Sequence, residues 1–115
     1  MRRPEIVNRI RIAMSKNVPQ ATTILYGSEA RGDARPDSDI DLLVLLPSEK
    51  ISYAEKDNVI DALFDIELET GVTISPYIIS EKAWKERPFT TPFYQNVVKD
   101  GINLSNIESY ERRIG

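Results

Sequence analysis

The 115-residue chain contains neither cysteine nor histidine, and its formal net charge is -3 at pH 7. This composition excludes disulfides, thiolate zinc sites, cysteine nucleophiles and serine–histidine triads, so any metal or acid–base chemistry must depend on carboxylates, which prefer hard cations such as magnesium. The acidic balance gives no strong signal for nucleic-acid binding, and no apolar run approaches the roughly 20 residues that span a bilayer.

The apolar pattern predicts alternating helices and strands in a single domain over residues 1–115, with its core at about 4–104. A helix is expected over about residues 4–16, and a short β-branched strand follows at 22–26. The nearly continuous apolar run at 40–46 is typical of a strand that is buried on both faces. Because the start of the chain lacks the apolar centre of a secretion signal and cysteine is absent, we expect a cytoplasmic protein.

Three more helices and one more strand are expected in the second half of the chain. The helices cover about residues 53–70, 81–86 and 92–100, the strand covers 72–79, and the hydroxyl residues suited to cap the helices are Ser52, Ser80 and Thr91. Gly71 suits the left-handed end of the long helix. This order predicts an α/β or α+β domain, in which helices pack on a mixed sheet of three or four strands. The short connection between the first two strands permits an antiparallel pair.

A glycine–serine pair, Gly27-Ser28, ends the first strand and precedes a short predicted helix. Glycine lets the backbone approach a ligand closely, and a helix start offers free N–H groups to phosphate oxygens. Ser28 adds a hydroxyl group at the same place. Taken alone, this turn is better explained as an ordinary strand-to-helix connection.

Two carboxylates, Asp39 and Asp41, lie two residues apart at the entrance of the second strand. The period of a strand points both to one face, where their repulsion would be relieved by a divalent cation. Arg31 is placed to contact phosphate or to anchor the loop through Asp33 or Asp37, and Ser38 is a further candidate for nucleotide binding. The plainer alternatives are that Ser38 and its neighbours cap a turn and that Arg31 is a solvated surface charge.

From Gly27 to Leu42 the chain reads Gly-Ser, Ala-Arg-Gly and Ser-Asp-x-Asp-Leu at fixed spacing. This segment resembles the signature of the DNA polymerase β-type nucleotidyltransferase superfamily, and specifically its minimal nucleotidyltransferase (MNT) members. The resemblance implies a polymerase β-like fold, ATP or another nucleotide as donor, and two magnesium ions. By position, Gly27 and Ser28 would bind phosphate, and Asp39 and Asp41 would hold metal as the catalytic carboxylates.

The resemblance also implies a partner. Many such domains act beside a helical HEPN protein, some as antitoxins that transfer AMP onto that toxin, while others are similar to aminoglycoside-modifying enzymes. The superfamily commonly places a third carboxylate on the next strand as a base toward the incoming hydroxyl. Here the expected position is Ser75, within Thr73-Ile74-Ser75-Pro76, and serine cannot serve as a carboxylate base.

Two functions therefore remain open at the level of the sequence. The first is magnesium-dependent transfer of a nucleoside monophosphate to a protein or small-molecule hydroxyl, as in the antitoxin of a HEPN/MNT pair. The second is a nucleotide-binding, partner-binding module with little catalysis. Self-association into a homo-oligomer is compatible with either. Aromatic residues late in the chain are expected mainly to pack, with a docking face as the alternative: Trp84, Phe89, Phe93 and Tyr94.

Overall fold

The computed structural model describes residues 1–106 and 110–111, so most of the charged tail that follows Ser105 lies outside the described residues. The described part contains five helices and four strands. In chain order they are α1 (Pro4–Asn17), β1 (Thr22–Tyr26), α2 (Gly27–Arg31), β2 (Ile40–Leu46), α3 (Tyr53–Thr70), β3 (Ile74–Ser80), α4 (Glu81–Lys85), α5 (Pro92–Asp100) and β4 (Ile102–Asn103).

The four strands form one mixed sheet in the order β3-β2-β1-β4. β1 pairs antiparallel with both β2 and β4, as the short connection between the first two strands allows, while β2 and β3 are parallel. The parallel pair needs a long crossover, which α3 supplies. The mixed sheet and the expected element order are therefore confirmed.

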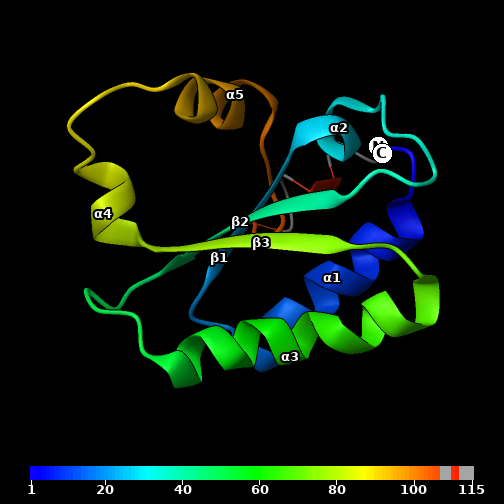
Figure 1. Ribbon diagram of the computed structural model, residues 1–115, viewed down its shortest axis with the longest axis horizontal. Coiled ribbons are helices and arrows are strands. Elements are labelled where there is room, and N and C mark those ends of the chain that lie inside the picture. Colours follow the sequence, from blue (N-terminus) through cyan, green and yellow to red (C-terminus); the bar gives the residue numbers. More distant parts are fainter. Residues whose placement is uncertain (107–109, 112–115) are drawn as a thin grey trace.

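Helices cover the sheet on both sides (Figure 1): α1 and α3 lie against one face, and α2, α4 and α5 lie on the other. β2 is central and has apolar residues on both faces. Leu42, Val44 and Leu46 join the core beneath α1 and α3, whereas Leu43 and Leu45 pack with Val97 of α5. Burial of each such side chain contributes about 1.5–3 kcal/mol, which explains why this run of the sequence is almost entirely apolar.

The three predicted caps are all present. The Ser52 hydroxyl accepts from the Glu55 amide while the Glu55 carboxylate accepts from the Ser52 amide, which completes a capping box at the start of α3. The Ser80 and Thr91 hydroxyls accept from the amides of Ala83 and Tyr94. These local bonds explain why the helix starts were predictable from the sequence.

Two details differ from the sequence-based expectation. β3 begins at Ile74 rather than at residue 72, because Gly71 ends α3 in a left-handed conformation and the Val72 amide donates to the Thr70 hydroxyl. β4 was not predicted. It is only two residues long and exists because Ile102 and Asn103 reach Leu25 and Ile24 of β1, so no repeating pattern marks it.

Candidate active site

The chain passes from β1 directly into α2 at Gly27. Tyr26 is still extended, whereas Gly27 has a φ of 77°, in the left-handed region that favours glycine. A Cβ atom on Gly27 would lie 2.6 Å from Oδ2 of Asp41. The turn therefore needs glycine for two reasons: its own conformation, and the close approach of the Asp41 carboxylate. Ser28 follows as the second residue of α2 and remains partly exposed.

Asp41 lies in β2 directly between Tyr26 of β1 and Ser75 of β3 in the strand register. Asp39 precedes the first residue of β2 and is exposed, and its side chain lies beside that of Ser75. Burial and the nearby charge of Asp39 raise the pKa of the Asp41 carboxyl above its usual range, while Arg31 opposes that shift. The structure thus brings the two carboxylates together on the α5 side of the sheet.

Ser75 faces the pair from the parallel strand. Its hydroxyl donates to Oδ2 of Asp39 over 3.5 Å. The position that the resemblance reserves for a third carboxylate is thus occupied by a neutral hydroxyl.

Arg31 anchors the end of α2. Its Nε lies 3.3 Å from Oδ2 of Asp33, and its Nη1 lies 3.7 Å from Oδ2 of Asp100 at the end of α5. The first contact is one of the two loop anchors suggested by the sequence; the second carried no signal in the sequence, because Asp100 is far along the chain. The Ser38 hydroxyl accepts from the Arg35 amide at 2.9 Å and so closes a turn in the loop before Asp39. A role for Ser38 toward nucleotide stays a prediction.

An aromatic cluster borders the carboxylates. The Phe93 ring meets those of Tyr26, Tyr77 and Trp84, with centroids 5.3, 5.6 and 6.0 Å apart, and Trp84 also meets Tyr94 at 5.2 Å. Burial, followed by the charge of Asp41 and the neighbouring Tyr77, raises the pKa of the Tyr26 hydroxyl. The rings of Trp84, Phe93 and Tyr94 thus contact one another as expected, although Phe93 is 36% exposed.

Phe89 differs from the other late aromatic residues, because it is 74% exposed. The expectation that it packs is therefore wrong. It lies in the connection between α4 and α5, outside both helices, so neither helix directs its ring toward the sheet.

The sequence of residues 7–102 matches the nucleotidyltransferase domain family. The chain belongs to this family. A Methanocaldococcus jannaschii protein whose name proposes a protein adenylyltransferase is 35% identical over 78 residues, which cover 68% of this chain and 71% of the relative.

Solved structures share the fold of this nucleotidyltransferase domain. One, named as a proposed minimal nucleotidyltransferase, has a TM-score of 0.56 and 25% identity, over 89% of this chain and 95% of the other. Another, a toxin–antitoxin with AMP-PNP, has a TM-score of 0.56 and 17% identity, over 91% and 84%. A third, a complex of tri-AMPylated Shewanella oneidensis HEPN toxin with MNT antitoxin, has a TM-score of 0.53 and 18% identity, over 96% and 79%. The polymerase β-like fold of the minimal nucleotidyltransferases is therefore confirmed.

The residues of this nucleotidyltransferase domain fit a magnesium ion that is shared with a substrate. Asp39, Asp41 and Ser75 offer only oxygen atoms, the donor type that Mg²⁺ prefers. Within residues 1–106 and 110–111, no cluster of three or more carboxylates, imidazoles or thiolates could enclose a metal by itself. Because Mg²⁺ commonly binds through one or two carboxylates plus substrate phosphates, a two-carboxylate site suits it. A bound cation would also relieve the repulsion from Asp39 that, after burial, raises the pKa of Asp41.

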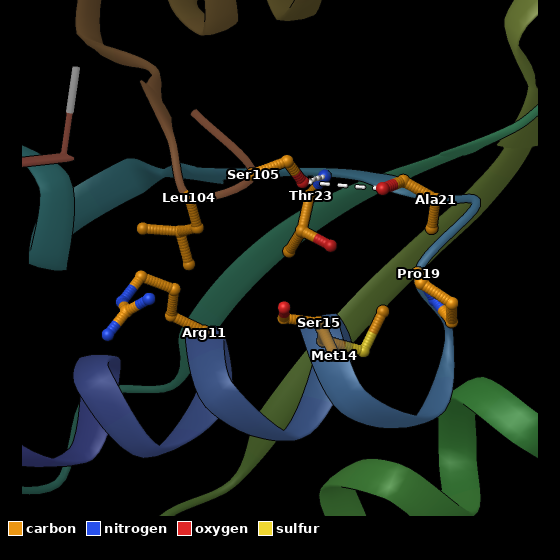
Figure 2. A pocket seen from close by; sticks show the side chains of 8 residues that line it. All are labelled: Arg11, Met14, Ser15, Pro19, Ala21, Thr23, Leu104 and Ser105. Atoms are coloured by element: carbon orange, nitrogen blue, oxygen red, sulfur yellow. Dashed lines mark hydrogen bonds between the residues drawn. The ribbon is translucent and has the colours of Figure 1, made fainter. Parts of the chain in front are cut away.

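A separate cavity of about 170 Å³ lies between α1 and β1, on the opposite face of the sheet from the carboxylates (Figure 2). Arg11, Ser15 and Thr23 contribute polar groups to its lining. The guanidinium of Arg11 donates to Oδ1 of Asn8 and lies 5.1 Å from the centroid of the Tyr110 ring. The nucleotidyltransferase motif contributes no residue to this lining.

None of the helices in the described part of the chain combines the length and the apolar character that crossing a bilayer requires.

Proposed function

We propose that this domain is a magnesium-dependent nucleotidyltransferase that moves AMP from ATP to a hydroxyl group of a helical HEPN-type partner protein. The observation that carries the proposal is the convergence of Asp39 and Asp41 beside the glycine turn at Gly27. Adenylate as the transferred group is supported by three names: the protein adenylyltransferase of the Methanocaldococcus jannaschii relative, and the AMP-PNP and the tri-AMPylated toxin of the two structural neighbours.

Each site residue has a proposed task. The backbone and hydroxyl groups of Gly27 and Ser28 would bind the outer phosphates, with Arg31 supporting the turn through Asp33 and Asp100. Asp39 and Asp41 would hold magnesium, which would neutralise charge that develops on the phosphates. Ser38 would complete the nucleotide-facing loop. These residues belong to a core that we place at about 4–104, in a protein that works where cytoplasmic ATP is available.

The proposed reaction forms a bond between the acceptor oxygen and the α-phosphorus of ATP, and it breaks the bond between the α- and β-phosphates. Pyrophosphate leaves and the acceptor hydroxyl loses its proton. Ser75 cannot take up that proton as a carboxylate would. The chain is therefore best suited to an acceptor whose hydroxyl is acidic or is activated by the partner protein.

A second candidate function is favoured by the same residue. If proton removal requires a carboxylate at the Ser75 position, the domain would bind nucleotide and its partner with little turnover, as an antitoxin-like module. Both functions need the site at Asp39 and Asp41; only the first needs pyrophosphate release.

The test is transfer of radiolabel from α-labelled ATP to a co-purified HEPN-type protein, with magnesium present. We expect a labelled partner and stoichiometric pyrophosphate with the natural sequence, and loss of both by a factor of about 100 or more with Asp39→Asn. Asp57→Asn is the matched control, because Asp57 is an exposed aspartate on α3. Nucleotide binding without any labelled product would favour the second function, and absence of binding would contradict both.

A further inference from the structure

Glu29 is a charged residue inside the protein. It lies on α2, one residue after Ser28, and its exposed fraction is 0%. No other charged residue in the described part of the chain is buried. A fully buried carboxylate is costly unless it is paired and hydrogen-bonded, so its partners show what it does.

The partners of Glu29 all belong to the N-terminal segment before α1. The amides of Arg2 and Arg3 donate to its Oε2 at 2.6 and 2.7 Å, and Nε of Arg3 donates to its Oε1 at 2.6 Å. The Arg3 side chain is itself only 12% exposed. The carboxylate also lies at the start of α1, where the helix dipole favours negative charge. Although burial alone would raise the pKa of Glu29, these hydrogen bonds lower it on balance.

The same two arginines also hold the loop that follows α2. Nε of Arg2 donates to the Gly32 carbonyl at 2.9 Å, and Nη1 of Arg3 donates to the Pro36 carbonyl at 3.3 Å. Gly32 ends α2, and Pro36 lies three residues before Asp39. The N-terminal segment thus contacts the chain at three points between the glycine turn and the metal-holding aspartate.

External support matters here because α2 has only five residues. So short a helix has no stability of its own in water, and its orientation depends on packing. Tyr26, its N-cap residue, makes no side-chain capping bond. Two side chains of α2 also form ion pairs: Arg31 with Asp33 and Asp100, of which Asp33 is exposed and Asp100 mostly buried, and Glu29 within a buried network.

We propose that Glu29 and Arg3 are positioning residues. They hold the Gly27–Ser28 turn at a fixed position relative to Asp39 and Asp41, so that one triphosphate can contact the turn and the two aspartates. The inference rests on the proposed function for what the turn binds. It adds a role for a motif position that the resemblance leaves variable, and for a segment outside the motif. If the Glu29–Arg3 ion pair only stabilised the fold, breaking it would lower the stability of the protein and leave the position of the turn unchanged.

The experiment compares Glu29→Gln, Arg3→Lys and the control Glu69→Gln, which breaks the exposed Arg9–Glu69 pair between α1 and α3. Two quantities are measured well below each variant's melting temperature: the Kd for Mg·AMP-PNP by calorimetry, and amide hydrogen exchange over residues 27–36. We expect Glu29→Gln to raise the Kd about tenfold and to speed exchange in that segment by a similar factor, because small displacements of binding groups are costly. Arg3→Lys should give a smaller change in the same direction, and Glu69→Gln should change neither quantity.

The outcomes separate the two proposals. A lower melting temperature in Glu29→Gln, with unchanged Kd and unchanged exchange over 27–36, would make the pair merely structural and overturn the inference. If the natural sequence binds no Mg·AMP-PNP, the proposed function fails, while faster exchange confined to 27–36 in Glu29→Gln would still support the positioning role. Should Glu29→Gln not fold, Arg3→Lys decides alone, because it keeps the carboxylate and both backbone hydrogen bonds to it.

Discussion

Asp41 belongs to the candidate site, and its charge lowers the stability of the native state. Its carboxylate is half-buried beside Gly27, and this burial, followed by the charge of Asp39, raises its pKa. Because the folded pKa is raised, ionised Asp41 destabilises the native state at neutral pH, and this penalty disappears below the ordinary aspartate pKa of 3.8. Removal of the charge should therefore stabilise the metal-free protein.

We predict that Asp41→Asn raises the melting temperature of the metal-free protein at pH 7 by a few degrees, and that this gain vanishes near pH 3. Adding Mg·ATP should reverse the order, because binding stabilises only the protein that retains the site. Differential scanning calorimetry with and without Mg·ATP checks both statements. An Asp41→Asn protein that is less stable than the natural sequence at pH 7 without metal would contradict the electrostatic account.

Ser75 lies beside the carboxylate pair and can be changed to the residue that the superfamily resemblance expects. We predict that Ser75→Asp raises the kcat for AMP transfer about tenfold or more, because a positioned general base typically contributes a factor of about 100 to 10,000. The rate should rise with pH as the new carboxylate ionises. Single-turnover kinetics with the partner protein provide the measurement. Unchanged transfer by a variant that still binds Mg·ATP would show that the partner supplies the base.

At the scale of elements, the junction between β1 and α2 restricts its sequence at a glycine. Gly27 has a left-handed backbone and lies against Asp41. Gly71, at the end of α3, has nearly the same φ of 72° but no atom within 4 Å of its added Cβ position. Substitutions at the two glycines therefore distinguish the cost of a left-handed backbone, which both share, from the contact with Asp41, which only Gly27 makes.

We predict that Gly27→Ala and Gly71→Ala each destabilise the protein by about 1 kcal/mol or slightly more, the cost of a left-handed alanine. Only Gly27→Ala should also abolish Mg·AMP-PNP binding, because its methyl group would displace the Asp41 carboxylate. Urea denaturation and calorimetric titration check the two effects. Equal nucleotide affinity in the two variants would mean that the close approach at Gly27 has no part in binding.

At the scale of the whole molecule, the buried Glu29 carboxylate joins α2 to the N-terminal segment, whose two arginines also bond to the loop that follows α2. The pKa of Glu29 is lowered from its ordinary value of 4.5. A carboxyl with a lowered folded pKa contributes stability that is present above pH 4.5 and lost as the pH falls through the folded value. Glu29 should thus account for part of the acid sensitivity of the fold.

We predict that the free energy of unfolding of the natural sequence falls steeply as the pH drops below about 4.5, and that Glu29→Gln shows a shallower fall over the same range. The reason is that the variant has no carboxyl to protonate at this position. Urea denaturation at a series of pH values gives both slopes. Glu69→Gln, which alters an exposed pair, should follow the curve of the natural sequence. Parallel curves for Glu29→Gln and the natural sequence would rule out the contribution of Glu29.

The sequence by itself determined the local structure and the chemistry of the motif. The helix caps at Ser52, Ser80 and Thr91 could be predicted because each hydroxyl accepts from an amide only three residues away. The central strand could be predicted because burial on both faces requires a continuous apolar run in the sequence. Asp39 and Asp41 shared a predicted face because the period of a strand is two, although Asp39 turned out to precede the strand itself.

Only the tertiary structure decided which distant groups support that motif. Arg3 forms an ion pair with Glu29, Asp100 forms one with Arg31, and the Phe93 ring contacts that of Tyr26. These residues are far apart in the sequence, and no local pattern encodes such contacts. β4 likewise depends on an edge of β1 that folding must first create. The physical reason is the same throughout: hydrogen bonds within a turn and the periodicity of an element depend on neighbouring residues, whereas ion pairs and ring contacts depend on how the elements pack.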